Sequence, residues 1–138
     1  MNYSNHNLLH LLNQSVRLMN QRMNEKLKEY DLYTSQWAII YCLHKNGPMT
    51  LTDIWQYMNV EAPTVTRTVK RLEEKGWLSR KPGTDKRQRI VHIADNAKDE
   101  VSRLADIIRS YEDEQLFHLS TEEENQLRQL LEHITSNK

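Results

Sequence analysis

The stretch Thr50–Ile93 constrains the fold more than any other part of this 138-residue chain. Its pattern of apolar residues and turn residues predicts two short helices, Leu51–Met58 and Ala62–Lys75, followed by two short strands. The strands are expected at Trp77–Lys81 and Gln88–Ile93. Helical periodicity covers most of the remaining chain. We therefore expect a mainly α-helical protein with a small β-hairpin.

Capping and turn residues mark the ends of these elements. Thr50, with Asp53 three residues later, is typical of a helix N-terminus. Pro63 is expected in the first turn of the second helix, where its missing N–H costs little. Gly76 suits a left-handed residue after the helix. The turn Pro82–Asp85 is too long for a two-residue hairpin.

Helices are predicted on both sides of this stretch. Apolar residues spaced by three and four predict a long helix over about Asn5–Tyr30. A second helix is expected over Ser35–Lys45, with Thr34 as its N-cap. Beyond the hairpin, we expect Asp95 to cap a long helix. Ser120–Glu123 has the pattern of a capping box at the start of the last helix.

Charge is distributed unevenly along a chain whose net charge is zero. Residues 60–92 carry nine Lys or Arg and four Asp or Glu, which gives +5. Residues 93–138 carry five and eleven, which gives −6. This asymmetry is a better guide to binding partners than the net charge, and it places a basic unit inside a chain whose C-terminal part is acidic.

The basic helix Ala62–Lys75 separates its apolar and cationic residues. On a helical wheel at roughly 100° per residue, Val65, Val69 and Leu72 form one narrow stripe. The cationic residues lie on the opposite face. This arrangement suits a helix whose apolar stripe docks on a core while its opposite face enters the major groove of DNA. An ordinary solvated helix is the alternative interpretation, supported by the Lys70–Glu74 pair at i,i+4. The residues on the cationic face are Thr64, Arg67, Lys70 and Arg71.

The hairpin adds further cations around a glycine-containing turn, namely Lys86, Arg87 and Arg89. A slim loop with an arginine can enter a minor groove, where the negative potential favours guanidinium. Asp85 is expected to pair with an arginine and fix its orientation. An exposed hairpin with routine charges is the alternative.

The order of elements and two segments, TVTRTVKRLEEKGWLSR and TDKRQRIVHI, resemble the MarR family of multiple antibiotic resistance regulators. The resemblance covers essentially the whole chain and is strongest over Thr50–Ile93. It implies one domain, residues 1–138, with a winged helix-turn-helix DNA-binding lobe at about 34–93. The flanking dimerisation helices would lie at about 1–31 and 95–138.

The resemblance also implies which residues meet DNA. Thr64, Arg67, Lys70 and Arg71 would lie on the recognition helix, with Arg87 in the minor groove. Thr66 is implied as well, although the wheel places it at about 200°, off the basic face. Two residues depart from the family pattern: Glu61 replaces a small polar N-cap, and Ala94 replaces the Thr that caps the next helix. The full set of expected DNA-binding residues is Thr64, Thr66, Arg67, Lys70, Arg71, Asp85, Lys86, Arg87 and Arg89.

The outer helices have apolar stripes with little sequence to cover them, so we expect a homodimer with twofold symmetry. Two basic lobes would then meet successive major grooves, about 34–36 Å apart, on a palindromic operator. The expected function is a sequence-specific transcriptional regulator, interpreted as a repressor. A winged-helix protein–protein interaction module that binds an acidic partner is the alternative.

Family resemblance suggests a cleft for a small-molecule effector, and four aromatic residues are candidates for its lining: Tyr30, Tyr33, Trp37 and Tyr41. The alternative is that these side chains belong to the core. Cys42 stands among apolar residues, which is typical of a buried structural thiol more than of a redox sensor. His6 and His10 share a helix face, but no acidic or cysteine partner is near them in sequence. We therefore expect no metal and no cofactor.

Several classes of protein are disfavoured. No run of about 18 apolar residues is present, so we expect no membrane span. The N-terminus lacks the pattern of a secretory signal, and the single cysteine fits a reducing cytoplasm. No nucleophile–base pair, phosphate loop or metal motif indicates an enzyme.

Overall fold

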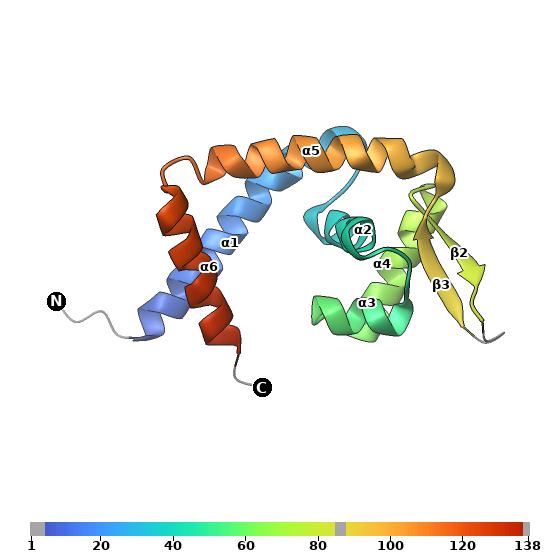
Figure 1. The fold of residues 1–138 in the computed structure, drawn as a ribbon, viewed down its shortest axis with the longest axis horizontal. Coiled ribbons are helices and arrows are strands. Elements are labelled where there is room, and N and C mark those ends of the chain that lie inside the picture. Colours follow the sequence, from blue (N-terminus) through green and yellow to red (C-terminus); the bar gives the residue numbers. More distant parts are fainter. Residues whose placement is uncertain (1–4, 85–87, 137–138) are drawn as a thin grey trace. The chain divides into compact units, whose positions relative to one another are not determined.

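A computed structural model of the chain describes residues 5–84 and 88–136. These residues belong to two compact units, Met1–Arg103 and Leu104–Lys138 (Figure 1). The elements of the first unit are α1 (Asn5–Leu27), the 3-10 turn η1 (Lys28–Tyr30), α2 (Thr34–Asn46), β1 (Met49–Thr50), α3 (Leu51–Met58), α4 (Ala62–Glu74), β2 (Leu78–Pro82), β3 (Arg89–Ile93) and the 3-10 turn η2 (Asp95–Ala97). Helix α5 (Lys98–Gln115) begins in the first unit and ends in the second, which also contains α6 (Thr121–Thr135). The expected mainly helical fold with a β-hairpin is confirmed.

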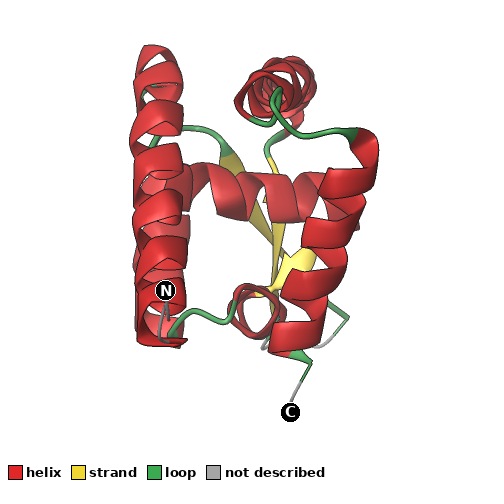
Figure 2. Cartoon of the chain, turned by 90° about the vertical axis from the view of Figure 1, so that its left-hand side faces the viewer, coloured by secondary structure: helices red, strands yellow, loops and turns green. Residues whose placement is uncertain are grey.

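The sheet has three antiparallel strands in the order β1-β3-β2. Figure 2 shows how small it is beside the helices. Val91 in the central strand pairs with Met49 on one side and with Arg80 on the other. A backbone bond from Ala94 N to Trp77 O, 2.9 Å long, extends the β2–β3 ladder at the end away from the turn. The two hairpin strands match the prediction with small changes at their ends, whereas β1 was not predicted.

The core of the first unit gathers apolar side chains from α2, α3, α4 and the sheet. The predicted stripe of α4 is confirmed, since Val65, Val69 and Leu72 are 1%, 0% and 0% exposed. Ile54 of α3 and Val91 of β3 are both fully buried. Burial of each such side chain contributes about 1.5–3 kcal/mol. This stripe fixes which face of α4 remains available to solvent.

Three of the predicted helix ends are confirmed by their hydrogen bonds and backbone conformation. The Thr50 side chain caps α3, because its hydroxyl accepts a 3.1 Å bond from Asp53 N. Ser120 and Glu123 form the reciprocal capping box of α6, at 3.1 and 2.9 Å. Gly76 has φ +88°, the left-handed conformation expected after α4.

Two other capping predictions were wrong. Tyr33 is the N-cap of α2 in place of Thr34, and the side chain of Gln36 accepts a 3.0 Å bond from the Tyr33 N–H. Asp95 begins the 3-10 turn η2, so it does not cap α5. Its carboxylate forms an ion pair of 3.3 Å with Lys98. The hydrogen bond with Lys98 is the largest cause that lowers the pKa of Asp95, and the charges of Lys81 and Lys98 lower it further.

Candidate nucleic-acid interface

Helix α4 presents its polar face to solvent along its whole length. The apolar stripe docks on the core, so the opposite face stays free. Its N-cap residue, Glu61, makes no side-chain capping bond. The predicted contact residues on this helix are all exposed in this structure, namely Thr64, Thr66, Arg67, Lys70 and Arg71.

Two threonines of α4 donate their hydroxyl hydrogens to the helix itself. Thr66 Oγ1 donates to Ala62 O at 2.9 Å, and Thr68 Oγ1 donates to Thr64 O at 2.9 Å. Such bonds to the i−4 carbonyl are a common arrangement for threonine inside a helix. They hold the hydroxyl oxygens close to the helix backbone.

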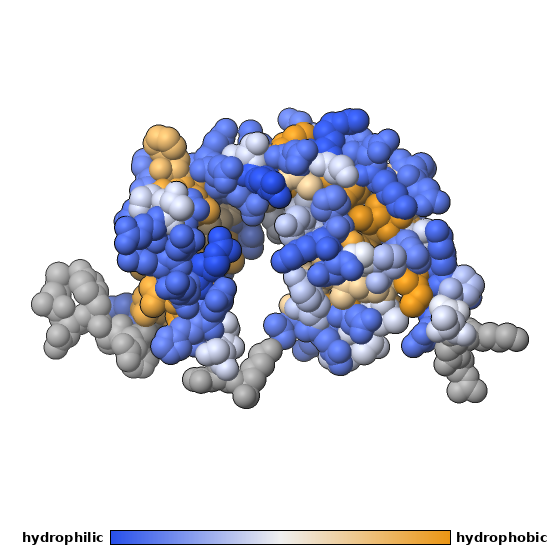
Figure 3. Space-filling view, viewed as in Figure 1, coloured by the Kyte–Doolittle hydropathy of each residue, from blue (hydrophilic) through white to orange (hydrophobic). Residues whose placement is uncertain are grey.

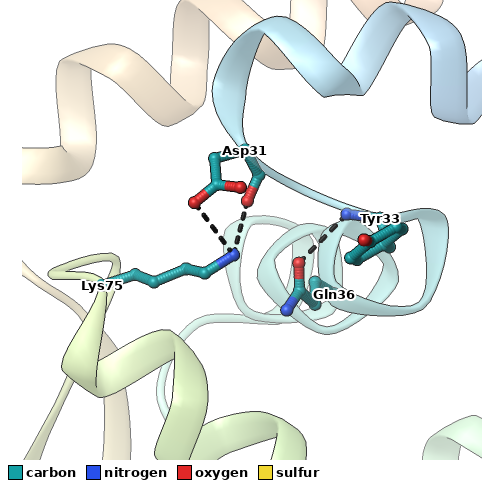
Figure 4. A network of polar contacts seen from close by, with 4 residues as sticks. All are labelled: Asp31, Tyr33, Gln36 and Lys75. Carbon is teal, nitrogen blue, oxygen red and sulfur yellow. Dashed lines mark hydrogen bonds and ion pairs between the residues drawn. The ribbon is translucent and has the colours of Figure 1, made fainter.

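The C-terminal end of α4 is attached to two neighbouring segments. The carboxylate of Glu73 accepts a 2.8 Å bond from Arg80 Nε of β2. Lys75, the C-cap residue, reaches the turn after η1 and contacts Asp31 (Figure 4). Sequence reasoning identified neither contact, because the partners lie 7 and 44 residues apart and only the folded chain brings them together.

The hairpin β2–β3 places Arg89 at the start of β3, opposite Pro82 and exposed to solvent. Gly83 directly follows β2, and its N–H donates a 3.0 Å bond to Gln88 O on the other side of the turn. A Cβ atom at that position would lie 3.1 Å from Cβ of Gln88, tighter than ordinary packing, so the close approach favours glycine. The predicted contact residues Asp85, Lys86 and Arg87 lie outside the described residues.

The four aromatic residues proposed for an effector cleft have different surroundings. Trp37 is 7% exposed, and its ring lies 6.0 Å from the ring of Tyr41. Tyr33 lines a cavity of about 520 Å³ with Asn24 and Lys28. Tyr30 lines another cavity, of about 660 Å³, with Lys75 and Trp77 among its neighbours.

Cys42 is buried, as the sequence predicts, with 1% of its surface exposed. Its sulfur lies 3.4 Å from the sulfur of Met49. Burial raises the pKa of the Cys42 thiol, while a hydrogen bond from Asn46 acts in the opposite direction. The desolvation of the sulfur is the larger effect, and the Asn46 hydrogen bond comes from within α2, four residues along the helix.

Two of the histidines that the structure describes line the same cavity. His44 and His92 line a cavity of about 260 Å³ with Lys98 and Ser102. In the part of the chain that the structure describes, no three His, Cys, Asp or Glu side chains form a group that could hold a metal ion. The described helices also include none that combines the length and apolar character needed to cross a bilayer.

A family model and a protein of related sequence both match this chain. The family model described as MarR matches residues 32–89. The chain is 47% identical over 116 residues to the HTH-type transcriptional regulator YwoH of Bacillus subtilis, covering 84% of this chain and 85% of that protein.

Solved structures of the same fold cover nearly the whole chain. A MarR protein from Peptoclostridium difficile superposes with a TM-score of 0.87 at 20% identity, covering 99% of this chain and 90% of that one. MepR of S. aureus in complex with DNA gives a TM-score of 0.81 at 22% identity, covering 98% of both chains. The identity to YwoH over most of both proteins, together with the matching family model, establishes that this chain belongs to the MarR family of transcriptional regulators.

Proposed function

We propose that this protein binds a specific palindromic DNA sequence as a homodimer and represses transcription there. The observation that carries the proposal is the exposed cationic face of α4, opposite a stripe that is almost completely buried. A helix held in this way can insert one face into the major groove without losing its core contacts. The structurally similar MepR of S. aureus was solved as a complex with DNA, which supports the same class of partner.

In this proposal α4 is the recognition helix. Arg67 and Arg71 can each donate two hydrogen bonds to the acceptors of guanine, and Lys70 supplies a point charge for phosphate. Thr64 and Thr66 add hydroxyl oxygens near the N-terminal turns. Contacts with the bases would determine which DNA sequence is recognised, whereas contacts with the phosphates would determine the register of the helix in the groove.

The hairpin would act as the wing beside the recognition helix. Arg87 is proposed to enter the minor groove, where negative potential favours a guanidinium group. Asp85 would orient that arginine, and Lys86 and Arg89 would contact the phosphate backbone. Arg89, which the structure describes, is exposed at the start of β3, next to the turn of the hairpin.

Exposed apolar side chains on α1 and α6 support the homodimer. In α1, Leu8 and Leu11 are 59% and 61% exposed, and in α6, Leu130 and Ile134 are 58% and 57% exposed. Figure 3 shows apolar surface among hydrophilic surface where Figure 1 draws α6. Burial of these side chains against a second copy would remove them from water, and the twofold pairing predicts an inverted-repeat operator.

A small-molecule effector would act by favouring a dimer whose recognition helices have the wrong separation for the operator. Tyr30, Tyr33, Trp37 and Tyr41 remain the proposed lining residues. The cavities beside Tyr30 and Tyr33 support a site near the end of α1.

A regulator of this kind would act where bacterial DNA is found, in the cytoplasm.

The test begins with selection of bound sequences from random DNA by the purified protein. We expect one inverted-repeat motif, with binding that falls steeply as salt increases. Lys70→Ala and Arg87→Ala should each weaken binding and lower the log–log salt slope by about one for each phosphate contact that is lost. Lys45→Ala, at the exposed end of α2, is the matched control and should bind as the wild type does.

Three outcomes would contradict the proposal. Equal binding by the wild type and by both variants would show that the proposed face does not meet DNA. A single half-site that binds as tightly as the full repeat would contradict reading by a dimer. Salt-dependent binding without any sequence preference would favour the protein–protein interaction module instead.

A further inference from the structure

The contact between Lys75 and Asp31 joins the C-cap residue of α4 to the turn that follows η1. Lys75 Nζ donates a 2.6 Å hydrogen bond to the backbone carbonyl of Asp31 and lies 3.4 Å from its Oδ2 atom (Figure 4). The lysine side chain is 24% exposed, and the aspartate side chain is 89% exposed. The 2.6 Å bond to the carbonyl has hydrogen-bond length, whereas the 3.4 Å ion pair involves an exposed carboxylate, so the carbonyl is the principal acceptor.

The acceptor is held in a rigid turn. Asp31 has φ +55°, a left-handed conformation that aspartate adopts more readily than most residues. Its N–H donates to Lys28 O at 3.1 Å, and the N–H of Leu32 donates to Leu27 O at 3.2 Å. Leu27 and Leu32 are 0% and 2% exposed, so both sides of the turn are anchored in the core.

The donor, Lys75, lies at the C-terminal end of α4, where side chains of this helix contact two neighbouring segments. At the other end, Glu61 makes no side-chain capping bond. The other described ion pair of α4 joins Glu73 to Arg80 on β2. The contact of Lys75 therefore connects α4 to the end of α1, and the ion pair of Glu73 connects it to the hairpin.

From this geometry we propose that Lys75 and Asp31 are positioning residues for DNA binding. Their contact holds the C-terminal end of α4 in the orientation that the DNA groove requires, without either side chain meeting DNA. The proposal rests on the proposed role of α4 as recognition helix. An oriented helix loses less conformational freedom on binding, so the contact increases affinity through preorganisation. The contact between Lys75 and Asp31 also couples α4 to the end of α1. Because Asp31 directly follows η1, a displacement of the end of α1 would move the C-terminal end of α4.

The first test compares Lys75→Met with Lys70→Ala on the selected operator over a series of salt concentrations. Lys75→Met should weaken binding by about 2- to 30-fold, the usual range for residues that act through a coupling contact. Its log–log salt slope should equal that of the wild type, because no phosphate contact is lost. Lys70→Ala should lower the slope by about two, because one phosphate contact is lost in each protomer of the dimer. Lys75→Arg keeps a charged donor and should restore most of the affinity.

A second test uses Asp31→Asn, which keeps the backbone acceptor and a residue type that tolerates positive φ. It should weaken binding less than Lys75→Met does, and it should have no further effect in the Lys75→Met background. Circular dichroism spectra and melting curves would verify that each variant is folded.

The possible results separate this inference from the proposed function. A wild-type protein without sequence-specific DNA binding would contradict the function itself. With wild-type binding intact, three results would overturn the positioning role: unchanged affinity in Lys75→Met, a salt slope lowered by about two in that variant, which is one per protomer, or full additivity of the Asp31 and Lys75 substitutions.

Discussion

At the scale of single residues, Cys42 illustrates how packing changes chemistry. Its thiol lies beside the Met49 sulfur in a site that is 1% exposed to solvent. Nucleophilic attack requires the thiolate, and burial disfavours that charged form. The sequence predicts this behaviour from the apolar neighbours of Cys42 in α2, and the structure confirms its burial. A redox signal at this residue would first require the thiol to become exposed to solvent.

The raised pKa of Cys42 predicts a loss of stability in alkaline solution. In the unfolded chain the thiol ionises near its ordinary value of 9.0, whereas the folded chain retains the proton to a higher pH. The unfolded state therefore gains stability relative to the folded state as pH rises above about 9. Urea unfolding of the wild type and Cys42→Ala at a series of pH values should show their stability difference changing in favour of the variant. A constant difference would contradict the raised pKa.

At the scale of elements, sequence patterns predict local structure well where the determinant is local. The bounds of α3 were predicted correctly, and α4 ends one residue earlier than expected. Strand β1 was missed because its two residues form a strand only through their pairing with β3. The contact of Lys75 with Asp31 was missed for the same reason, since nothing near either residue in sequence indicates the other. On the proposed DNA-binding face, the helical wheel was sufficient to predict which side of α4 is exposed.

The N-cap of α3 provides a test at this scale. Thr50→Ala removes the hydroxyl that accepts the Asp53 N–H, which should lower the free energy of unfolding by about 1 kcal/mol. Thr52→Ala, an exposed position in the first turn of the same helix, is the matched control and should change stability little. Thermal unfolding followed by circular dichroism would measure both. Equal losses in the two variants would show that the cap contributes nothing specific.

At the scale of the whole molecule, charge is segregated along the chain. The basic segment, residues 60–92, contains α4 and the hairpin, whereas the acidic segment, residues 93–138, contains α5 and α6. This arrangement explains how a chain with no net charge can have a strongly basic face. It also keeps the acidic helices separate in sequence from the segment proposed to bind DNA.

The homodimer can be tested on α6. Leu131→Asp places a charge in the apolar stripe of that helix, where Leu131 is 40% exposed. If a second copy covers the stripe, the buried charge should shift the protein from dimer to monomer in sedimentation experiments. Gln129→Asp adds the same charge on the opposite side of α6 and should leave the dimer intact. A wild type that sediments as a monomer, or a Leu131→Asp variant that remains dimeric, would contradict the proposed interface.

The hydroxyl bond of Thr66 restricts what that residue can recognise. A threonine hydroxyl has one hydrogen, and in this structure Thr66 donates it to Ala62 O. While that bond is kept, the side chain offers only lone pairs and a methyl group. A phosphate oxygen is itself an acceptor and would find no donor there. The exocyclic amino groups of adenine and cytosine, or the thymine methyl group, would be suitable neighbours. In the proposed complex, Thr66 would therefore be better suited to a base edge than to a phosphate oxygen, and phosphate contacts would fall to the cations of α4.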